Sequence, residues 1–323
     1  EIVFGDWSSD VCSSDLFNLH TAGKGPPEIT LEVNPEDITE TFVLELTETP
    51  FNRISLGVQS FIEEELRYLQ RRHSPAQSLR AIRLLQEAGF DNISIDFIFG
   101  LPGTGEASLR LNLEKIFSLE IPHFSAYALT VEEGTPQAWM IRKQRILPPD
   151  DELQAAQFIR LMKLVREYGY EQYEISNFAR DGRYSRHNTG YWQGTPYLGL
   201  GPSAHSYNVW SRRWNVSGLT PYLEAIRKGE RLFEEEILSK TEQYNEYVMT
   251  SLRTVWGCSL QKIEHNFGQP YQQFITHRVM IYIRNGWVVE NNGHLCLSDE
   301  GKLRADGIAA QLFMEDVESG QGC

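Results

Sequence analysis

The sequence predicts an α/β fold in which a partial TIM-like (β/α)6 barrel is followed by a mostly helical, winged-helix-like C-terminal domain. Two observations predict it. Strand-like and helix-like patterns alternate from about residue 27 to residue 175, which indicates a parallel sheet with right-handed helical crossovers. Further along, helical segments surround two short β-rich runs joined by Asn291-Asn292-Gly293, and this turn sequence is typical of a β-hairpin.

Short runs of β-branched and aromatic residues, bounded by turn residues, are expected to form the strands of the barrel. The predicted strands are Glu28–Val33, Arg53–Val58, Asn92–Phe99, His123–Thr130 and Tyr170–Ile175. In TIM-like barrels the functional residues lie at the C-terminal ends of the strands. That rule selects Glu32 and Asn34, Gln59, Asp96–Pro102, Thr130–Gly134 and Asn177.

Helical patterns fill the intervals between these strands. Asn34-Pro35-Glu36-Asp37 combines a capping residue, a proline suited to the first turn and two acids. A helix carrying Ile38, Phe42 and Leu46 is therefore expected to begin there. The other helices that apolar spacing predicts in this region are Ser74–Gly89, Ser108–Leu119 and Asp150–Tyr168.

Composition and charge exclude several classes of function. The 323 residues carry a formal net charge of −14, which argues against nucleic acid as a partner because phosphate contacts need a basic face. The four cysteines are scattered, without the short spacing of a metal knuckle. They also suggest no disulfide framework, so a cytoplasmic location is expected. The sequence shows no membrane-spanning run and no signal peptide.

The chain is expected to divide into four segments. Residues 1–16 repeat Ser-Ser-Asp without any helical or strand period, and we interpret them as a non-native leader, with a native disordered tail as the alternative. Residues 17–178 are expected to form the partial barrel. Residues 179–219 form a connecting segment rich in glycine and aromatic residues, and residues 220–323 form the C-terminal domain.

Several strand-end residues have both a functional and a structural interpretation. Gly100-Leu101-Pro102-Gly103 lets a backbone approach a ligand closely, or it is an ordinary strand-to-helix turn. Asp96 lies in an apolar run, where a carboxylate binds ligand hydroxyls or is hydrogen-bonded within the protein. Glu32 is either ligand-facing or solvated, and Gln59 offers both a donor and an acceptor.

Arg186-His187-Asn188-Thr189-Gly190-Tyr191-Trp192 is a sharper combination. His187 beside Asn188, Tyr191 and Trp192 is suited to offer an imidazole to haem iron between aromatic walls. The alternative is a packed loop histidine that is hydrogen-bonded to the asparagine. His205 follows in a second glycine-rich loop, but the spacing of two loop histidines does not define a metal site.

Taken together, five stretches of the chain resemble the oxygen-independent coproporphyrinogen III oxidase family, whose members are radical S-adenosylmethionine (SAM) proteins. The stretches are Leu31–Pro35, Arg53–Phe61, Leu69–His73, Ile95–Gly103 and Tyr127–Thr135. The His187-Asn188-x-x-Tyr191-Trp192 sequence is similar to the signature of the HemW-type haem chaperones within that family. The resemblance extends in order from about residue 27 to the C-terminus.

The resemblance implies cofactors and site residues. Members bind SAM on a [4Fe-4S] cluster that a Cys-x3-Cys-x2-Cys loop holds. By position, the residues that match the SAM site of the family are Glu32, Gln59, Arg71, Asp96 and Thr130. In the haem-chaperone branch, haem is bound and handed to acceptor haemoproteins, and His187 with Asn188, Tyr191 and Trp192 would contact it. The C-terminal domain would be the winged-helix domain of the family.

Two functions follow from the resemblance. The first is that of a haem chaperone, whose acceptor can itself be membrane-associated. The alternative is an oxygen-independent coproporphyrinogen III oxidase in porphyrin biosynthesis. The sequence contains no Cys-x3-Cys-x2-Cys, so two opening βα units are expected to be missing. The cluster is then expected in a full-length parent, and this chain is expected to be inactive in radical chemistry, which leaves its enzymatic status open.

Overall fold

The computed structural model describes residues 26–315, which form two compact units that divide after Ser185. Each unit is described by itself. The expected leader of residues 1–16, with Cys12, and the first residues of the expected barrel segment lie outside the described residues. The predicted domain boundaries at residues 178 and 219 stay predictions.

The first unit is built on a six-stranded sheet with the order β1-β2-β3-β4-β6-β5. Its strands are β1 (Thr30–Val33), β2 (Arg53–Gln59), β3 (Ile93–Phe99), β4 (His123–Ala128), β5 (Glu171–Glu174) and β6 (Asn177–Ala179). The first four pair in parallel, as the alternation of strands and helices predicts. Within the described residues the order is linear, with β1 and β5 at its edges.

Strand β6 was missed by the sequence analysis, and it changes the far edge of the sheet. It is inserted between β4 and β5 and runs antiparallel to both. Only Ile175 and Ser176 separate β5 from β6, and so short a connection permits a hairpin but not a crossover. Asn177 therefore begins a strand of its own and pairs with Ser125, rather than following the free end of the fifth strand.

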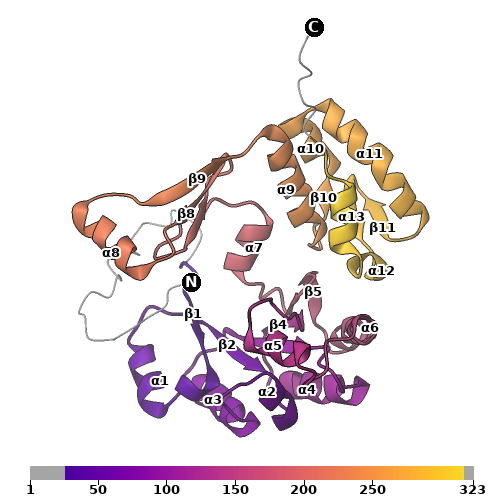
Figure 1. Cartoon of the computed structure of the whole chain (residues 1–323). Helices are drawn as coiled ribbons and strands as arrows, with labels where there is room; N and C mark the ends of the chain where they lie inside the picture. The colour runs from indigo at the N-terminus through magenta and orange to yellow at the C-terminus, as the bar shows by residue number, and fades with distance from the viewer. Residues whose placement is uncertain (1–25, 316–323) are drawn as a thin grey trace. The chain divides into compact units, whose positions relative to one another are not determined.

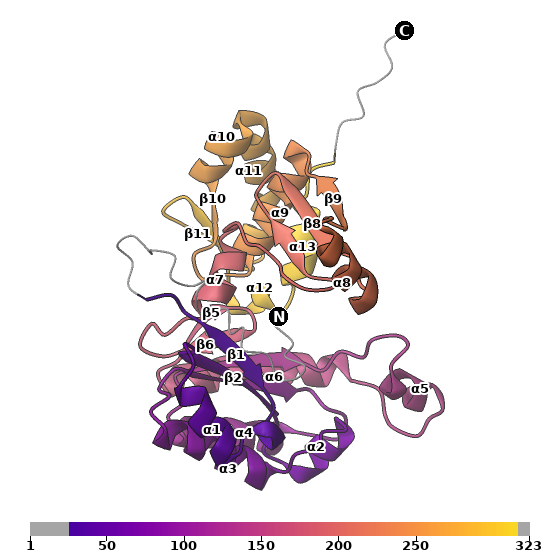
Figure 2. The same ribbon diagram turned by 90° about the vertical axis from the view of Figure 1, so that its left-hand side faces the viewer.

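Helices cover one face of this sheet (Figures 1 and 2). This unit contains the short 3-10 turn η2 (Pro35–Asp37) and the helices α1 (Glu40–Thr47), α2 (Glu63–Tyr68), α3 (Pro75–Glu87), α4 (Glu106–Ser118), α5 (Pro136–Arg142) and α6 (Asp151–Glu167). A capping box formed by Ser74 and Gln77 begins α3, and Asp150 caps α6. The first predicted helix starts later than expected. Pro35 opens only the 3-10 turn, and Thr39 caps α1 by accepting a hydrogen bond from the Phe42 amide.

The second unit contains two small antiparallel sheets, β7-β8-β9 and β10-β12-β11. Its elements are α7 (Arg186–Trp192), β7 (His205–Tyr207), β8 (Ser211–Asn215), α8 (Leu219–Lys228), β9 (Phe233–Ile237), α9 (Lys240–Leu252), β10 (Cys258–Ser259), α10 (Leu260–Phe267), α11 (Gln269–Arg284), β11 (Val288–Asn291), β12 (His294–Leu297), α12 (Asp299–Lys302) and α13 (Ala305–Gln311).

The C-terminal part of this unit has winged-helix connectivity, as the sequence predicts. Helix α9, strand β10, helices α10 and α11, and the β11–β12 hairpin follow in that order. The hairpin turns at Asn292 and Gly293, both with positive φ, because a tight hairpin turn needs left-handed residues. Fully buried Tyr244, Ile263 and Ile275 lie in its core. None of the helices in residues 26–315 is long and apolar enough to cross a membrane.

Candidate functional site

The two faces of the six-stranded sheet differ in chemistry. Side chains alternate between the faces of a strand. In β3, Ile95 and Phe97 face the helices and are almost completely buried, while Asp96 faces the other side. Parallel pairing aligns Asp96 with Ser125 of β4, and antiparallel pairing aligns Ser125 with Asn177 of β6. Polar residues thus form a row across the face that the helices leave uncovered.

Asp96 is the most strongly perturbed carboxyl on this face. Burial is the main cause, and together with the negative charge of Glu32 it raises the pKa of Asp96 to about 6. A hydrogen bond with Ser125 and the charges of Arg53 and Arg71 oppose that rise. Asp96, Glu32 and Arg71 therefore interact electrostatically, as expected for residues of one site.

Part of this row of polar residues was not predicted from the sequence. The Ser125 hydroxyl donates to Oδ1 of Asn177 over 3.0 Å, and Nδ2 of Asn177 donates to Glu174 over 2.7 Å. Burial raises the pKa of Tyr127, and the negative charge of Asp96 adds to that rise. A hydrogen bond between the Tyr127 hydroxyl and Ser125 opposes it. The period-two pattern of His123-Phe-Ser-Ala-Tyr127 would have placed Ser125 and Tyr127 on the face of Asp96.

A second hydrogen-bonded set links β3, β4 and β5, and it lies nearer the N-terminal ends of β3 and β4 than this row. His123 lies 2.7 Å from the Ser94 hydroxyl through Nδ1 and 2.8 Å from the Tyr173 hydroxyl through Nε2. Burial and the nearby Arg53 hold the pKa of His123 well below its ordinary value. The imidazole is therefore neutral at neutral pH. Its two hydrogen bonds join β3, β4 and β5 close to Asp96.

Gln59 adopts an uncommon backbone conformation at the end of β2. Its φ is 65°, in the left-handed region, next to a register irregularity after Leu56. A side chain at Gly57 would lie 3.2 Å from Nε2 of Gln59 and 3.5 Å from Oδ1 of Asn34. The glycine thus leaves room for the Gln59 amide beside Asn34, at the end of the sheet where β1 also ends.

Thr130 is not joined to the other predicted SAM residues by any interaction in the described part of the chain. It is exposed after β4, and its hydroxyl donates to the Ala128 carbonyl over 3.4 Å. Of the five predicted residues, the structure therefore brings Glu32, Arg71 and Asp96 into electrostatic contact. It places Gln59 at the same end of the strands, and Thr130 beyond the end of β4.

The Gly100-Leu101-Pro102-Gly103 turn is shaped by α6. The Gly100 amide donates to Gln157 over 2.8 Å, and Nε2 of Gln154 donates to the Leu129 carbonyl over 2.8 Å. A Cβ at Gly100 would lie 2.4 Å from Gln154, and its φ is +74°. Glycine is thus required here by backbone conformation and by packing against α6, which supports the structural interpretation of this turn.

The two cofactors that the resemblance implies differ in how well the described residues suit them. An acid-rich, partly buried face suits the hydroxyls, amino group and positive sulfonium of SAM. The described residues include two cysteines, both in the C-terminal unit, and burial raises the pKa of Cys258 to about 12. No group of three ligating side chains placed to hold a metal occurs within residues 26–315. These residues do not fit a [4Fe-4S] cluster, and we derive no reaction step from one.

The predicted haem residues lie on a helix rather than in a loop. Helix α7 spans Arg186–Trp192, so His187 and Tyr191 are one turn apart and share a face. Their rings meet edge to face at 4.5 Å, and Tyr191 meets Tyr197 in the same way at 4.6 Å. The sequence did not predict this helix because a short helix of mixed polar and aromatic residues carries no apolar period.

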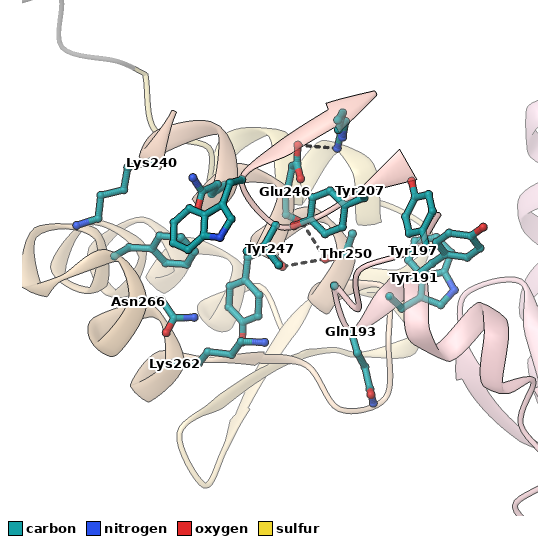
Figure 3. A pocket seen from close by; sticks show the side chains of 17 residues that line it. Tyr191, Gln193, Tyr197, Tyr207, Lys240, Glu246, Tyr247, Thr250, Lys262 and Asn266 are labelled. Carbon is teal, nitrogen blue, oxygen red and sulfur yellow. Dashed lines mark hydrogen bonds and ion pairs between the residues drawn. The ribbon is translucent and has the colours of Figure 1, made fainter. Parts of the chain in front are cut away.

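A pocket of about 650 Å³ opens beside α7 within the second unit (Figure 3). Tyr191 and Trp192 both line it, whereas His187 lies one turn away, in contact with Tyr191. The rest of its lining comes from the loop after α7, the β7–β8 hairpin, α9 and α10, and it includes the aromatic residues Tyr197, Tyr207, Trp210, Tyr247 and Phe267. This size is in the range for sites that bind small molecules and cofactors. Because the lining residues are far apart in the sequence, no local sequence pattern could have predicted the pocket.

A contact between Arg253 and Trp192 helps to position the predicted haem residues. The guanidinium of Arg253, just beyond α9, lies 5.2 Å from the Trp192 ring, which holds α7 against α9 by a cation–π contact. Arg253 is itself paired with Asp306 at 2.8 Å. His205, the second histidine of the sequence analysis, begins β7 and lies 6.1 Å from the Trp214 ring. It does not line the pocket.

Comparison with known protein families finds two matches. The pattern of the Radical SAM superfamily matches residues 11–116, and that of the HemN C-terminal domain matches residues 238–304. The first match covers the predicted SAM residues Glu32, Gln59, Arg71 and Asp96, and the second covers most of the winged-helix module.

Individual relatives cover most of the chain. A heme chaperone HemW from Lactococcus lactis subsp. lactis is 30% identical over 292 residues, which are 90% of this chain and 76% of the relative. The heme chaperone HemW of Bacillus subtilis is 31% identical over 289 residues, 89% of this chain and 76% of that protein. The structure of coproporphyrinogen III oxidase (HemN) from Escherichia coli, described as a radical SAM enzyme, superposes with a TM-score of 0.72. It is 20% identical, over 89% of this chain and 70% of that one, which shows a shared fold.

Proposed function

The chain belongs to the HemW family of radical SAM proteins, and from this premise we propose that it binds haem and delivers it to acceptor haemoproteins. The observation that carries the proposal is the position of α7. This helix brings Tyr191 and Trp192 of the predicted motif to the wall of an aromatic pocket. Flat aromatic side chains offer a porphyrin both apolar area and stacking partners.

His187 is the proposed contact to the haem iron. Neutral imidazole is a common haem ligand, and the His187 ring touches Tyr191, which lines the pocket. Asn188 is adjacent on the same helix and is proposed to orient the group bound there. Because haem would be passed on rather than kept, an exposed ligand on a short helix suits the task better than a buried one.

The proposal assigns SAM to the polar face of the six-stranded sheet. Glu32 and Asp96 would accept hydrogen bonds from the ribose hydroxyls or the amino group, and Gln59 and Arg71 would hold polar ends. Thr130 is the fifth proposed contact. SAM supplies an activated sulfonium when it is bound, and the residues of this chain bind it and orient it. We also propose a cytoplasmic location, where the isolated thiols of this chain stay reduced.

Haem titration followed by absorbance tests the proposal. The wild-type chain is expected to bind haem and to transfer it to apomyoglobin. His187→Ala is expected to weaken binding about tenfold or more, which corresponds to about 1.4 kcal/mol, and to shift the Soret band. His205→Ala is the matched control, because His205 lies outside the pocket lining, and it is expected to leave both readouts unchanged.

Three results would separate the parts of the proposal. Absence of haem binding by the wild-type chain would end it. Equal binding by His187→Ala would remove the iron contact but leave the pocket. The competing function, oxygen-independent coproporphyrinogen III oxidation, is favoured by the match to the HemN C-terminal domain. Tighter binding of coproporphyrinogen III than of haem in a competition titration would support that alternative instead.

A further inference from the structure

The pocket beside α7 is positively charged, although the whole chain is strongly acidic. Its ionisable lining side chains, tyrosines aside, are Arg212, Lys240, Lys262 and Glu246. Three are cations and one is a carboxylate. This local excess of positive charge is surrounded by a chain with a formal net charge of −14, so it marks the pocket as a place for an anionic ligand.

One of the three cations is already neutralised by the protein. The guanidinium of Arg212, on β8, lies 2.5 Å from the Glu246 carboxylate on α9 (Figure 3). The Glu246 side chain is 22% exposed and the Arg212 side chain 43% exposed, so the pair is partly shielded from water, and separating it would leave a mostly buried carboxylate without its partner. Arg212 therefore has its carboxylate partner within the protein.

The two lysines have no carboxylate partner in the part of the chain that the structure describes. Nζ of Lys262, on α10, lies 4.6 Å from the centre of the Tyr247 ring. Nζ of Lys240, at the start of α9, lies 5.9 Å from the centre of the Tyr271 ring. Both side chains are exposed. They rest on aromatic rings and can turn toward a ligand carboxylate without breaking an ion pair.

Helix α9 gives the pocket two different ends. Lys240, Gln243, Tyr247 and Thr250 line it from one side of this helix, over a length of about 15 Å at 1.5 Å per residue. Figure 3 shows Tyr191 and Tyr197 at one end and Lys240 at the other, with Lys262 beside Tyr247 on the Lys240 side of the pocket. A flat apolar body and charged substituents at one of its edges would match these two ends.

We propose that this pocket selects porphyrins that carry two carboxylates on one edge, with Lys240 and Lys262 each pairing with one of them. The inference rests on the proposed function, which it deepens by naming the class of porphyrin. Haem and protoporphyrin IX have two adjacent propionates. Coproporphyrin has four, spread around the ring, and two of them would enter the aromatic end without a cationic partner. An unpaired carboxylate there is unfavourable, so the pocket discriminates against coproporphyrin.

Titration of the full chain with three metal-free porphyrins tests the inference without iron ligation. The probes are protoporphyrin IX, its dimethyl ester and coproporphyrin III, and the readout is quenching of tryptophan fluorescence, since Trp192 and Trp210 line the pocket. Protoporphyrin IX is expected to bind about tenfold more tightly than either other probe, because charge-assisted pairs are lost in the ester.

Variants assign the effect to the lysines. The double variant Lys240→Met, Lys262→Met keeps the apolar stems, and it is expected to bind protoporphyrin IX and its ester equally. Lys115→Met, an exposed lysine on α4, is the matched control and keeps the wild-type preference. Glu246→Gln frees Arg212 and is expected to raise the affinity for coproporphyrin III several-fold, because a third cation becomes available.

The outcomes distinguish this inference from the function on which it rests. Equal binding of protoporphyrin IX and its ester by the wild-type chain overturns the inference and leaves haem binding intact. Tighter binding of coproporphyrin III than of protoporphyrin IX also overturns it and favours the oxidase alternative. No binding of any of the three metal-free porphyrins overturns the inference, and the haem titration described above then decides the proposed function separately.

Discussion

The two candidate sites of this chain have opposite chemistry. The sheet face in the first unit gathers the carboxylates of Glu32, Asp96 and Glu174, and it is fixed by hydrogen bonds between neighbouring strands. The pocket in the second unit gathers aromatic rings and the ammonium groups of Lys240 and Lys262, which are exposed. The first site is suited to a cationic, hydroxyl-bearing ligand, and the second to a flat anion.

The contrast teaches how rigidity is divided between the two sites. On the sheet, the carboxyl of Asp96 is held in a partly buried environment that raises its pKa to about 6. That arrangement stores unfavourable free energy, as functional sites often do. In the pocket, the charged lysines keep their water until a ligand arrives. Mutations at the first site should therefore change stability as well as affinity, and mutations of the lysines at the second site should change mainly affinity.

The largest expected effect is at Asp96. A carboxyl whose pKa is near 6 in the folded chain and near its ordinary value of about 3.9 when unfolded destabilises the fold as it ionises. The loss begins near pH 4, is complete above pH 6, and amounts to roughly 2–3 kcal/mol. Asp96→Asn removes it, so the variant should exceed the wild type in unfolding free energy at pH 7 and nearly equal it at pH 4. Urea unfolding at several pH values measures this.

A second variant sharpens the test of Asp96. Ser125→Ala removes a hydrogen bond that opposes the rise in the pKa of Asp96, so the upper limit of the pH range over which stability falls should move upward while the lower limit stays near pH 4. Hydrogen exchange of the β3 and β4 amides locates the effect in the first unit. A stability difference between Asp96→Asn and the wild type that does not change with pH would contradict the assignment.

The next effect separates packing from backbone conformation in the turn after β3. Gly100 and Gly103 both have positive φ, but a Cβ at Gly100 would lie 2.4 Å from Gln154, whereas nothing lies within 4 Å of one at Gly103. Gly103→Ala is expected to cost about 1 kcal/mol of unfolding free energy from the left-handed backbone alone. Gly100→Ala adds the displacement of Gln154, and roughly 2 kcal/mol in total is expected. If the two variants lose the same unfolding free energy in thermal or urea unfolding, Gln154 of α6 moves aside at no measurable cost.

The sequence predicted the parallel strands and the functional end of the sheet because both depend on local pattern. Alternation of strands and helices predicts β1 to β4, and strand ends predict where Glu32, Gln59 and Asp96 lie. Strand β6 has three residues, too few for a period. Its place between β4 and β5 depends on the short turn after Glu174 and on pairing with a strand about fifty residues earlier.

The pocket was harder to predict for a related reason. His187, Tyr191 and Trp192 were identified by resemblance to a motif, while their helical conformation was missed. The remaining walls come from a β-sheet and from two helices of the winged-helix module, which no spacing in the sequence connects. Lys240 and Lys262 are ordinary surface lysines by sequence, and only their convergence on one cavity suggests a role.

The smallest expected effect concerns how firmly α7 is held at the pocket. Arg253 lies 5.2 Å from the Trp192 ring, and Arg304 lies 4.6 Å from the Trp287 ring, which is outside the pocket lining. Each contact is expected to contribute about 0.5–1 kcal/mol. Arg253→Gln should therefore weaken protoporphyrin IX binding about two- to threefold, because a bound ligand must then order α7 itself. Arg304→Gln should cost similar stability and leave binding unchanged. If both variants bind protoporphyrin IX alike, α7 is positioned by its other neighbours, and the pocket wall resembles the sheet face in being fixed before the ligand arrives.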